Sequence, residues 1–387
     1  MFRFESSFIN DMFINKKTNA FIILILYILI DFIEIIKKKN KYNDGKKFID
    51  KCLNDMNIKN YNITYQFPLL SIIIPAFNCE KTILFPISSI QNQNISTFEI
   101  ILINDFSQDN TSKILQIFQK RDKRVKIINN KKNMGTLYSR CIGTLIAKGE
   151  YIFPLDNDDM VFGEDIFDYT IKKAKENNYD IIGFKAVRTK NYSENIIKMK
   201  DLYYYSFPNN LVVYQPELST WILSLNGKFS PHDITLWGKI IKSKVYIKAI
   251  NLLGVRRYSK FISWAEDTSM NFIIFNIAET YKFIYKYGIL HLSSSFTASS
   301  TQPINNNFFG LLFWLEIIFD FSKNNENKNY SAQAALYITK IYFKYKSIIN
   351  KTNLSCLKNI IFKIIKSKHI NKKYKCILHK SLNHFDN

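Results

Sequence analysis

The stretch YIFPLDNDDMVFGED, residues 151–165, is an apolar run that ends abruptly in carboxylates. Its first five residues read as a buried strand, and Asp156, Asp158 and Asp159 follow directly. Like charges held this close raise one another's pKa unless a positive charge neutralises them. Water does this at an ordinary surface turn, and a divalent cation does it at a metal site. The surrounding sequence has to distinguish these two interpretations.

Short apolar strands alternate with helical segments on both sides of this stretch. The predicted strands cover residues 69–74, 98–103, 125–128, 151–155 and 179–187. The predicted helices cover residues 83–90, a segment that begins near Ser107 with Asp109 or Asn110 as N-cap, and residues 137–146, which Gly149 closes. This alternation predicts an α/β fold with a mostly parallel central sheet and helices on both faces. We expect the sheet to end with residues 179–187.

Polar side chains follow three of the predicted strands. The first strand leads to Phe77, Asn78 and Glu80, the second to Asn104 and Asp105, and the fourth to Asp156, Asp158 and Asp159. Ligands of open parallel sheets bind outside the carboxyl ends of the strands, so these groups are expected to converge. The chain has neither GxGxxG nor GxxxxGK[ST], so the phosphate cradle of a dinucleotide site or a P-loop is missing.

Convergence of these strand ends favours a metal site over a solvated turn. Asp156 and Asp158 are two residues apart and can share one face of an extended segment, and Asp159 can turn toward the same point. Clustered carboxylate oxygens suit Mg²⁺ or Mn²⁺, which commonly bind one or two carboxylates together with substrate phosphates. Such a metal would hold a diphosphate and take up negative charge as the diphosphate departs.

Two groups of motifs carry a resemblance to a known family. SIIIPAFNCEKTI, FEIILINDFSQDNT and NMGTLYSRCIGTLIAKGEYIFPLDNDD resemble the nucleotide-sugar half of glycosyltransferase family 2, which has the GT-A fold. LWGKIIKS, WAEDTSMNFIIF and YKYGILHLSSSFT resemble its acceptor half. The resemblance covers about residues 68–300. It divides the chain into an N-terminal helical segment (1–66), a catalytic domain (67–300, with halves 67–160 and 161–300) and a helical, basic C-terminal extension (301–387).

On the donor side, the resemblance assigns roles residue by residue. Pro75, Phe77, Asn78 and Glu80 match the loop that lies along the nucleotide, and Asp105 matches the acid that meets the base. In the DXD-type motif, Asp156 and Asp158 match sugar-nucleotide contacts, Asp158 and Asp159 match metal ligands, and His291 matches a further ligand. Asn104 stands where the family usually has Asp, and Phe106 replaces a usual Gly. An aromatic side chain at 106 weakens any inference about which nucleotide binds.

On the acceptor side, Glu266 and Asp267 match the acidic pair whose second member is the usual catalytic base. An acidic pair at the start of a helix is also stabilised by the helix dipole. A catalytic role and this structural role are compatible. Trp237 and Lys239 match the segment that shapes the acceptor and sugar pocket, and Arg140 matches a polar helix facing the sugar.

The resemblance implies an inverting, metal-assisted glycosyltransferase of hexosyl or N-acetylhexosaminyl type. The donor is a nucleoside-diphosphate sugar, with UDP as the default by family frequency, and the acceptor is a glycan or a lipid-linked sugar. Nucleotidyl transfer is an alternative, but it usually brings a glycine-rich basic loop that PAFNCEKT lacks. A catalytically inactive sugar-nucleotide-binding or membrane-associated scaffold also stays open, although it predicts broken acidic motifs.

The charge of the chain is strongly positive and uneven. Lys and Arg number 54 against 32 acids, and residues 324–387 hold 13 lysines and two acids. Such a tail suits an anionic membrane surface or a nucleic acid, and compositional drift is the alternative. No zinc-finger spacing or RNA-binding signature accompanies it, so we expect no nucleic-acid partner. The five cysteines are scattered and form no CxxC pair, which favours a reducing compartment.

An apolar segment near the N-terminus, NAFIILILYILIDFIEII (residues 19–36), bears on location. Its uninterrupted part covers only residues 20–30, short of the ~20 apolar residues that a membrane span needs. No small-residue cleavage site follows, which argues against a signal peptide. A membrane anchor, an interfacial helix and a buried helix all remain open. If the segment spans, the lysines after it leave the main domain on the cytoplasmic side, which is the expected location.

Overall fold

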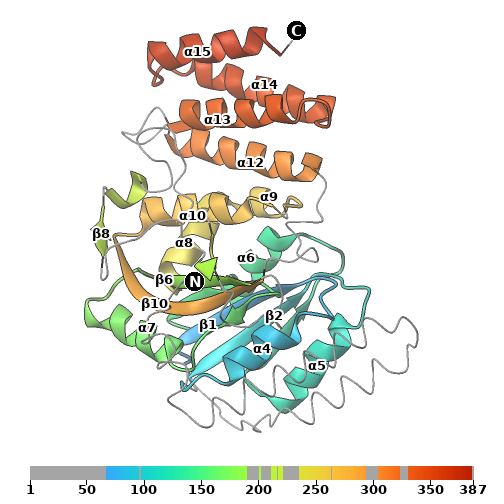
Figure 1. Cartoon of the computed structure of the whole chain (residues 1–387), viewed down its shortest axis with the longest axis vertical. Helices are drawn as coiled ribbons and strands as arrows, with labels where there is room; N and C mark the ends of the chain where they lie inside the picture. Colours follow the sequence, from blue (N-terminus) through green and yellow to red (C-terminus); the bar gives the residue numbers. More distant parts are fainter. Residues whose placement is uncertain are drawn as a thin grey trace, which may run out of the picture.

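The computed structural model describes residues 67–95, 97–189, 200–201, 211–215, 217–220, 235–262, 264–292, 304–322 and 330–385. Within these residues, helices cover both faces of a central β-sheet and four C-terminal helices stack above one face (Figure 1). The predicted N-terminal segment, including residues 19–36, lies outside the described residues. Among the described helices, none combines the length and the apolar character needed to cross a bilayer.

The sheet has the strand order β3-β2-β1-β4-β9-β6-β10-β5, with β7 beside β6 and β8 beside β10. The strands are β1 (Leu70–Ala76), β2 (Phe98–Asn104), β3 (Val125–Asn129), β4 (Tyr151–Pro154), β5 (Met160–Val161), β6 (Ile181–Thr189), β7 (Lys200–Asp201), β8 (Val212–Tyr214), β9 (Lys239–Lys242) and β10 (Thr280–Leu292). β3, β2, β1 and β4 are mutually parallel, and β6 is parallel to β10. β9 lies antiparallel between β4 and β6 and joins the two parallel groups into one mixed sheet.

The helices segregate by the face that they cover. They are α4 (Leu84–Gln91), α5 (Thr111–Arg121), α6 (Thr136–Ile146), α7 (Ile166–Glu176), η2 (Glu217–Thr220), α8 (Ser243–Leu253), α9 (Val255–Tyr258), α10 (Glu266–Ile277), α12 (Ile304–Ser322), α13 (Tyr330–Lys344), α14 (Lys351–Lys366) and α15 (Lys372–Asn383). α4, α5 and α7 lie below the sheet in Figure 1, and α6, α8 and α10 lie above it. Because helices cover both faces, all seven residues of β1 and of β2 are buried, and all but Ser71, Glu99 and Asn104 are apolar.

The predicted α/β fold is confirmed, as are the strands and helices expected between residues 69 and 155. The prediction that the sheet ends with residues 179–187 is wrong, because β9 and β10 continue it. Their sequences lie beyond a long connection and break the regular strand–helix alternation on which the prediction rested. Gly149 does not close α6, which already ends at Ile146. It packs instead on β1, where a Cβ at Gly149 would lie 2.6 Å from the backbone nitrogen of Ser71.

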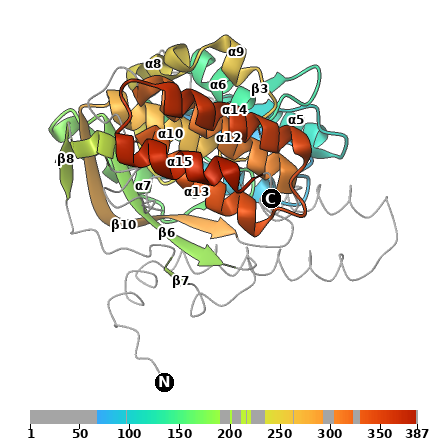
Figure 2. The same cartoon turned by 90° about the horizontal axis from the view of Figure 1, so that it is seen from above.

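The C-terminal helices share a core with the upper layer of the domain. One buried cluster contains side chains of α8 and α10 together with those of α12 to α15, including the fully buried Trp314. Figure 2 shows the stack lying across α10. α12 comes closest at Gly310, where a Cβ would lie 2.1 Å from the carbonyl oxygen of Trp264. The backbone just before α10 is therefore pressed directly against α12.

Gly310→Ala tests this contact. An alanine in a helix normally gains up to ~1 kcal/mol over glycine, but here the methyl group collides with the Trp264 carbonyl. We expect a net loss of ~1–3 kcal/mol in the free energy of unfolding, measured by urea or thermal denaturation. Lys340→Ala, at an exposed position of α13, is the control and should be neutral or stabilising. A Gly310→Ala protein as stable as the parent would contradict the close approach.

Candidate active site

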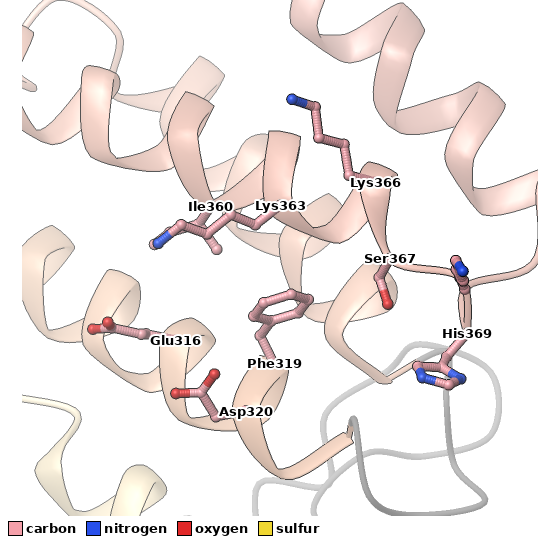
Figure 3. Close-up of a pocket in the computed structure, with 9 residues that line it drawn as sticks. Glu316, Phe319, Asp320, Ile360, Lys363, Lys366, Ser367 and His369 are labelled. Carbon is pink, nitrogen blue, oxygen red and sulfur yellow. The ribbon is translucent and has the colours of Figure 1, made fainter.

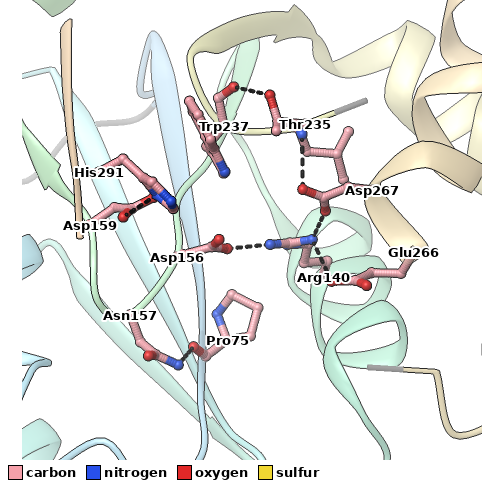
Figure 4. A network of polar contacts seen from close by, with 11 residues as sticks. Pro75, Arg140, Asp156, Asn157, Asp159, Thr235, Trp237, Glu266, Asp267 and His291 are labelled. Atoms are coloured by element: carbon pink, nitrogen blue, oxygen red, sulfur yellow. Dashed lines mark hydrogen bonds and ion pairs between the residues drawn. The ribbon is translucent and has the colours of Figure 1, made fainter. Parts of the chain in front are cut away.

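Three strand ends and two helix starts meet at one edge of the sheet. β1 pairs in register with β2 and β4, so Pro75 lies beside Ile103, and Ile73 lies beside Pro154. The side-chain amide of Asn157 donates a hydrogen bond of 2.9 Å to the carbonyl oxygen of Pro75 and ties two of these ends together (Figure 4). The predicted convergence of polar strand ends is therefore present in the structure.

Asp156, Asp158 and Asp159 form the acidic cluster of this edge. Each can offer one carboxylate oxygen such that the three atoms lie within 4.8 Å of one another. Asp159 is fully buried, and its Oδ2 has no hydrogen-bond partner among the residues that the structure describes. Burial, with the neighbouring carboxylates, raises the pKa of Asp158 and of Asp159. An unpartnered buried carboxylate oxygen beside two further carboxylates fits a hard divalent cation, which supplies the charge that the cluster lacks.

His291 from β10 lies against this cluster. Its Nδ1 is 2.9 Å from Oδ1 of Asp159, and the backbone N–H of Leu292 donates to the same oxygen at 3.1 Å. The His291 ring stacks on Trp237 with centroids 5.1 Å apart. Burial lowers the pKa of His291, but Asp159 raises it more, to about 9. Without a metal, His291 is therefore the cation that partly balances Asp159.

Arg140, on α6, connects the two halves of the site. Its guanidinium is 3% exposed and contacts Asp156, Asp267 and Glu266, the last at 3.1 Å (Figure 4). Burial lowers the pKa of Arg140, but the three carboxylates raise it well above its ordinary value. One permanently charged side chain thus joins the end of β4 to the start of α10.

Glu266 and Asp267 occupy the first turn of α10. The residue before them, Ala265, has φ 59°, a left-handed conformation that is unusual for a residue with a side chain. Oδ2 of Asp267 accepts a hydrogen bond of 3.1 Å from the backbone N–H of Leu236. Burial raises the pKa of Asp267, which Arg140 partly offsets, while burial and Asp267 raise the pKa of Glu266 to about 8. Both acids therefore bind a proton more strongly than they would in water, and of the two side chains Asp267 is the one that accepts a hydrogen bond from Leu236.

Other predicted donor residues are held by local hydrogen bonds. The Asp105 carboxylate accepts from the backbone N–H groups of Met134 and Gly135, both at 2.8 Å, and fixes the chain before α6. Oε2 of Glu80 accepts from the backbone N–H of Asn110 at 2.9 Å, at the start of α5. Asn78 has φ 47° and its side chain accepts from Gln108. These residues shape the first two loops through their backbone contacts.

Aromatic and basic residues complete the predicted set. Phe77 is 42% exposed on the first loop, and Phe106 is 47% exposed with φ 66° on the second. Trp237 is buried against His291. Lys239 is also buried, and its Nζ donates to the carbonyl oxygen of Thr235 at 2.6 Å. Lys239 thus fixes the backbone at Thr235. The following residue, Leu236, donates its backbone N–H to Asp267.

The structure therefore gathers the predicted residues into two linked groups. The first contains Asp156, Asp158, Asp159, His291 and Trp237, and the second contains Arg140, Glu266 and Asp267. Asp105 and Glu80 are held in neighbouring loops. Sequence reasoning missed the amide of Asn157 and the backbone N–H of Leu236 as positioning groups. A backbone donor leaves no signature in residue type, whereas Asn157 lay inside the acidic motif and could have been considered.

Comparisons with known proteins agree with this geometry. Residues 71–222 match the model of the family described as Glycosyl transferase family 2. The chain is 29% identical over 218 residues to the uncharacterized glycosyltransferase EpsJ of Bacillus subtilis, covering 56% of this chain and 59% of that protein. It is 28% identical over 191 residues to GalNAc(5)-diNAcBac-PP-undecaprenol β-1,3-glucosyltransferase of Campylobacter jejuni, covering 46% and 62% of the two chains. The alignments thus span less than two thirds of either relative.

Solved structures support the same class at the level of the fold. TarS of S. aureus, residues 1–349 in complex with UDP-GlcNAc, superposes with a TM-score of 0.55 at 14% identity, covering 81% of this chain and 87% of that one. The architecture is therefore a GT-A fold. The part of this chain that matches the family model, residues 71–222, is a glycosyltransferase family 2 domain.

The pKa of Glu266 predicts a pH-dependent stability. An acid whose pKa is raised by folding from 4.5 to about 8 stabilises the protein below pH 4.5 relative to higher pH. That contribution is lost as the pH rises from 4.5 to 8. We expect Glu266→Gln, which stays neutral, to flatten the fall in melting temperature over this interval in EDTA. Glu176→Gln, on the exposed face of α7, should keep the parent slope, and an equal slope in Glu266→Gln would contradict the assignment.

Proposed function

We propose that this protein is an inverting glycosyltransferase. It moves a sugar from a nucleoside-diphosphate sugar to a hydroxyl group of a glycan or lipid-linked acceptor. UDP is the expected nucleotide of the donor. The observation that carries the proposal is the pairing of two acidic groups through Arg140. Asp156, beside Asp158 and Asp159, contacts one side of the Arg140 guanidinium, and Glu266 and Asp267 contact the other. A donor site and a base thus lie next to each other, as a single displacement requires.

Asp267 is the proposed general base. It takes the proton of the acceptor hydroxyl while that oxygen forms a bond to the anomeric carbon of the donor. The bond from the anomeric carbon to the phosphate oxygen breaks, and the nucleoside diphosphate leaves with the electron pair on the opposite face. Arg140 and the backbone N–H of Leu236 hold the Asp267 carboxylate in a fixed orientation. Glu266 contacts the same guanidinium at 3.1 Å and helps to hold Arg140 in place beside Asp267.

The donor side of the site fits a divalent cation, either Mn²⁺ or Mg²⁺. Asp158 and Asp159 would hold it, with Asp156 and His291 at the border of the site. A bound cation supplies positive charge to the departing diphosphate. Asp159 contributes a fully buried carboxylate, whose charge would interact strongly with the cation, and Asp156 and Asp158 contribute half-buried ones. Pro75, Phe77, Asn78, Glu80 and Asp105 are proposed to line the nucleotide, and Trp237 and Lys239 the sugar and acceptor side.

Two relatives support the choice of substrates. TarS binds UDP-GlcNAc in the structure cited above, and this favours a UDP-sugar of the hexose or N-acetylhexosamine type. The Campylobacter jejuni relative is named for an undecaprenol-linked acceptor, and this favours a lipid-linked glycan. We propose action at a membrane on the second of these grounds, and at its cytoplasmic side because of the lysines that follow residues 19–36.

A thermal-shift panel tests donor binding. Nucleoside diphosphates and nucleotide sugars are each added with Mn²⁺, Mg²⁺ or EDTA, and a ligand at a hundredfold excess over Kd stabilises the native state by ~2.7 kcal/mol. We expect one nucleotide family to raise the melting temperature only with metal. Asp159→Asn should abolish the shift because it removes the buried carboxylate charge, and Asp168→Asn, an exposed surface pair with Lys172, should keep it. No shift with any nucleotide on folded protein would favour the scaffold alternative.

Asp267→Asn tests the base separately from donor binding. The substitution keeps the shape of the side chain but removes its ability to accept a proton. We expect nucleotide release from the donor in the presence of acceptor to fall by ~10²–10⁴-fold, while the metal-dependent thermal shift persists. Release is measured with a coupled nucleotide assay against Asp168→Asn. Unchanged turnover would assign the base elsewhere, and an abolished thermal shift would mean that Asp267 serves donor binding instead.

A further inference from the structure

A hollow of about 700 Å³ lies between α12 and the C-terminal end of α14, away from the site described above (Figure 3). Glu316 and Asp320 of α12 line one wall. Lys363 and Lys366 of α14, with Lys368 just after the helix, line the other. Side chains of opposite charge thus face the hollow from two helices. The net charge of the hollow decides which ligands it attracts.

The two carboxylates are already paired by the catalytic domain. Nζ of Lys260 is 3.7 Å from Oε2 of Glu316, and the guanidinium of Arg257 contacts Asp320. Lys363, Lys366 and Lys368 are exposed. Five cations therefore surround two carboxylates, and the hollow keeps a net positive charge. Such a site is complementary to an anion.

Exposed apolar side chains accompany these cations. Val255 is 60% exposed on α9, Phe261 is 46% exposed three residues after α9 ends, and Phe362 is 49% exposed on α14. Nζ of Lys366 lies 5.8 Å above the Phe362 ring. Figure 2 shows α8, α9 and α14 along one edge of the molecule, and the ion pairs to α12 link α9 to the hollow. We call this surface, from α9 to the C-terminal end of α14, the docking edge.

We propose that the docking edge binds the surface of an anionic lipid bilayer. Cations attract anionic headgroups, and apolar side chains between them can enter the interfacial region of the bilayer. Charge alone would not select this edge, because the described residues 330–385 contain 12 lysines and no acid. The hollow lined by Lys363, Lys366 and Lys368 is what distinguishes this edge, because exposed apolar side chains also occur elsewhere on the stack, as at Ile348. Val255 offers no ring on which a base could stack, whereas an apolar side chain of any shape can enter the interfacial region of a bilayer.

The docking edge is connected to the proposed base. The chain between α9 and α10 leads from Lys260 and Phe261 to Glu266. On the way, the carbonyl oxygen of Ile262 accepts a hydrogen bond of 3.2 Å from the backbone N–H of Leu137, at the start of α6. A bilayer on this edge would thus lie next to the segment that leads into the acceptor side. A bilayer in this position could deliver a lipid-linked acceptor to the site. Acceptor delivery rests on the proposed function, whereas bilayer binding itself does not.

Vesicle co-sedimentation with the full-length protein tests the proposal. The vesicles contain phosphatidylglycerol mixed with phosphatidylcholine, or phosphatidylcholine alone. We expect binding to the anionic vesicles only, weakening as salt rises. Reversal of the three hollow lysines, Lys363→Glu with Lys366→Glu and Lys368→Glu, should lower the partition coefficient at least ~10-fold. Absence of binding by the parent protein would overturn the proposal.

A matched control separates the edge from the overall charge. Lys344→Glu with Lys346→Glu and Lys351→Glu changes the net charge equally, at the end of α13 and the opposite end of α14. We expect this control to bind clearly better than the hollow variant. Equal loss in both variants, or a larger loss in the control, would overturn the assignment of this edge. So would a parent protein that binds single-stranded RNA with the same dependence on the hollow lysines and ignores anionic vesicles.

A second variant tests the apolar contribution without changing charge. Phe261→Ser with Phe362→Ser should lower vesicle binding ~3-fold or more, because two exposed apolar anchors are lost. Unchanged binding would overturn the apolar part of the docking edge. All variants are checked for an unchanged melting temperature and for the metal-dependent nucleotide shift. Loss of vesicle binding with a preserved nucleotide shift is the expected result, and an absent nucleotide shift in the parent bears on the proposed function alone.

Discussion

The contact between Arg140 and three carboxylates is the interaction on which the two halves of this protein depend. Arg140 is buried on α6 and contacts Asp156 at the end of β4 and both acids at the start of α10. Removing one partner of a buried ion pair leaves an uncompensated charge, which is strongly destabilising. The acids cannot be held so close without this cation, and the cation cannot be buried without the acids. The distance between the acidic cluster and the proposed base is therefore fixed by the same contact that keeps the site folded.

The start of α10 is also constrained from its other side. The chain before α10 passes between α6 and α12, where Gly135 and Gly310 allow the backbone to come close. A Cβ at Gly135 would lie 2.9 Å from the carbonyl oxygen of Ile262, and one at Gly310 would lie 2.1 Å from that of Trp264. Between these contacts and the helix, Ala265 takes a left-handed conformation. Strained backbone of this kind persists only where its surroundings over-determine it. The C-terminal stack is thus part of what positions Glu266 and Asp267, and it also carries the basic end of α14.

The sequence predicted the local parts of this arrangement and not the distant ones. β1, β2 and β4 were predictable because burial on both faces gives continuous apolar runs, and their ends were predictable because the polar residues follow at once. The role of Arg140 in joining the two halves was not, since its partners Glu266 and Asp267 lie 126 and 127 residues away. β9 and β10 were missed because their partners, β4 and β6, come from earlier parts of the chain. The family resemblance predicted the acidic pair Glu266 and Asp267. The packing of α12 on the Trp264 carbonyl was not predictable, because Gly310 is the one residue whose type points to it.

The charge distribution of the chain follows from the same constraints. A protein of net charge +22 keeps its densest acids where Arg140 and His291 neutralise only part of their charge. The remaining deficit lies at Asp158 and Asp159, where burial and neighbouring acids raise the pKa values and one carboxylate oxygen lacks a donor. A divalent cation would remove that excess of negative charge, and the diphosphate of the proposed donor would in turn balance the cation. At the other end of the molecule the imbalance has the opposite sign, because Lys260 and Arg257 already neutralise the acids beside the hollow lysines. The two regions thus call for ligands of opposite charge, a cation at the edge of the sheet and an anionic surface at the end of α14.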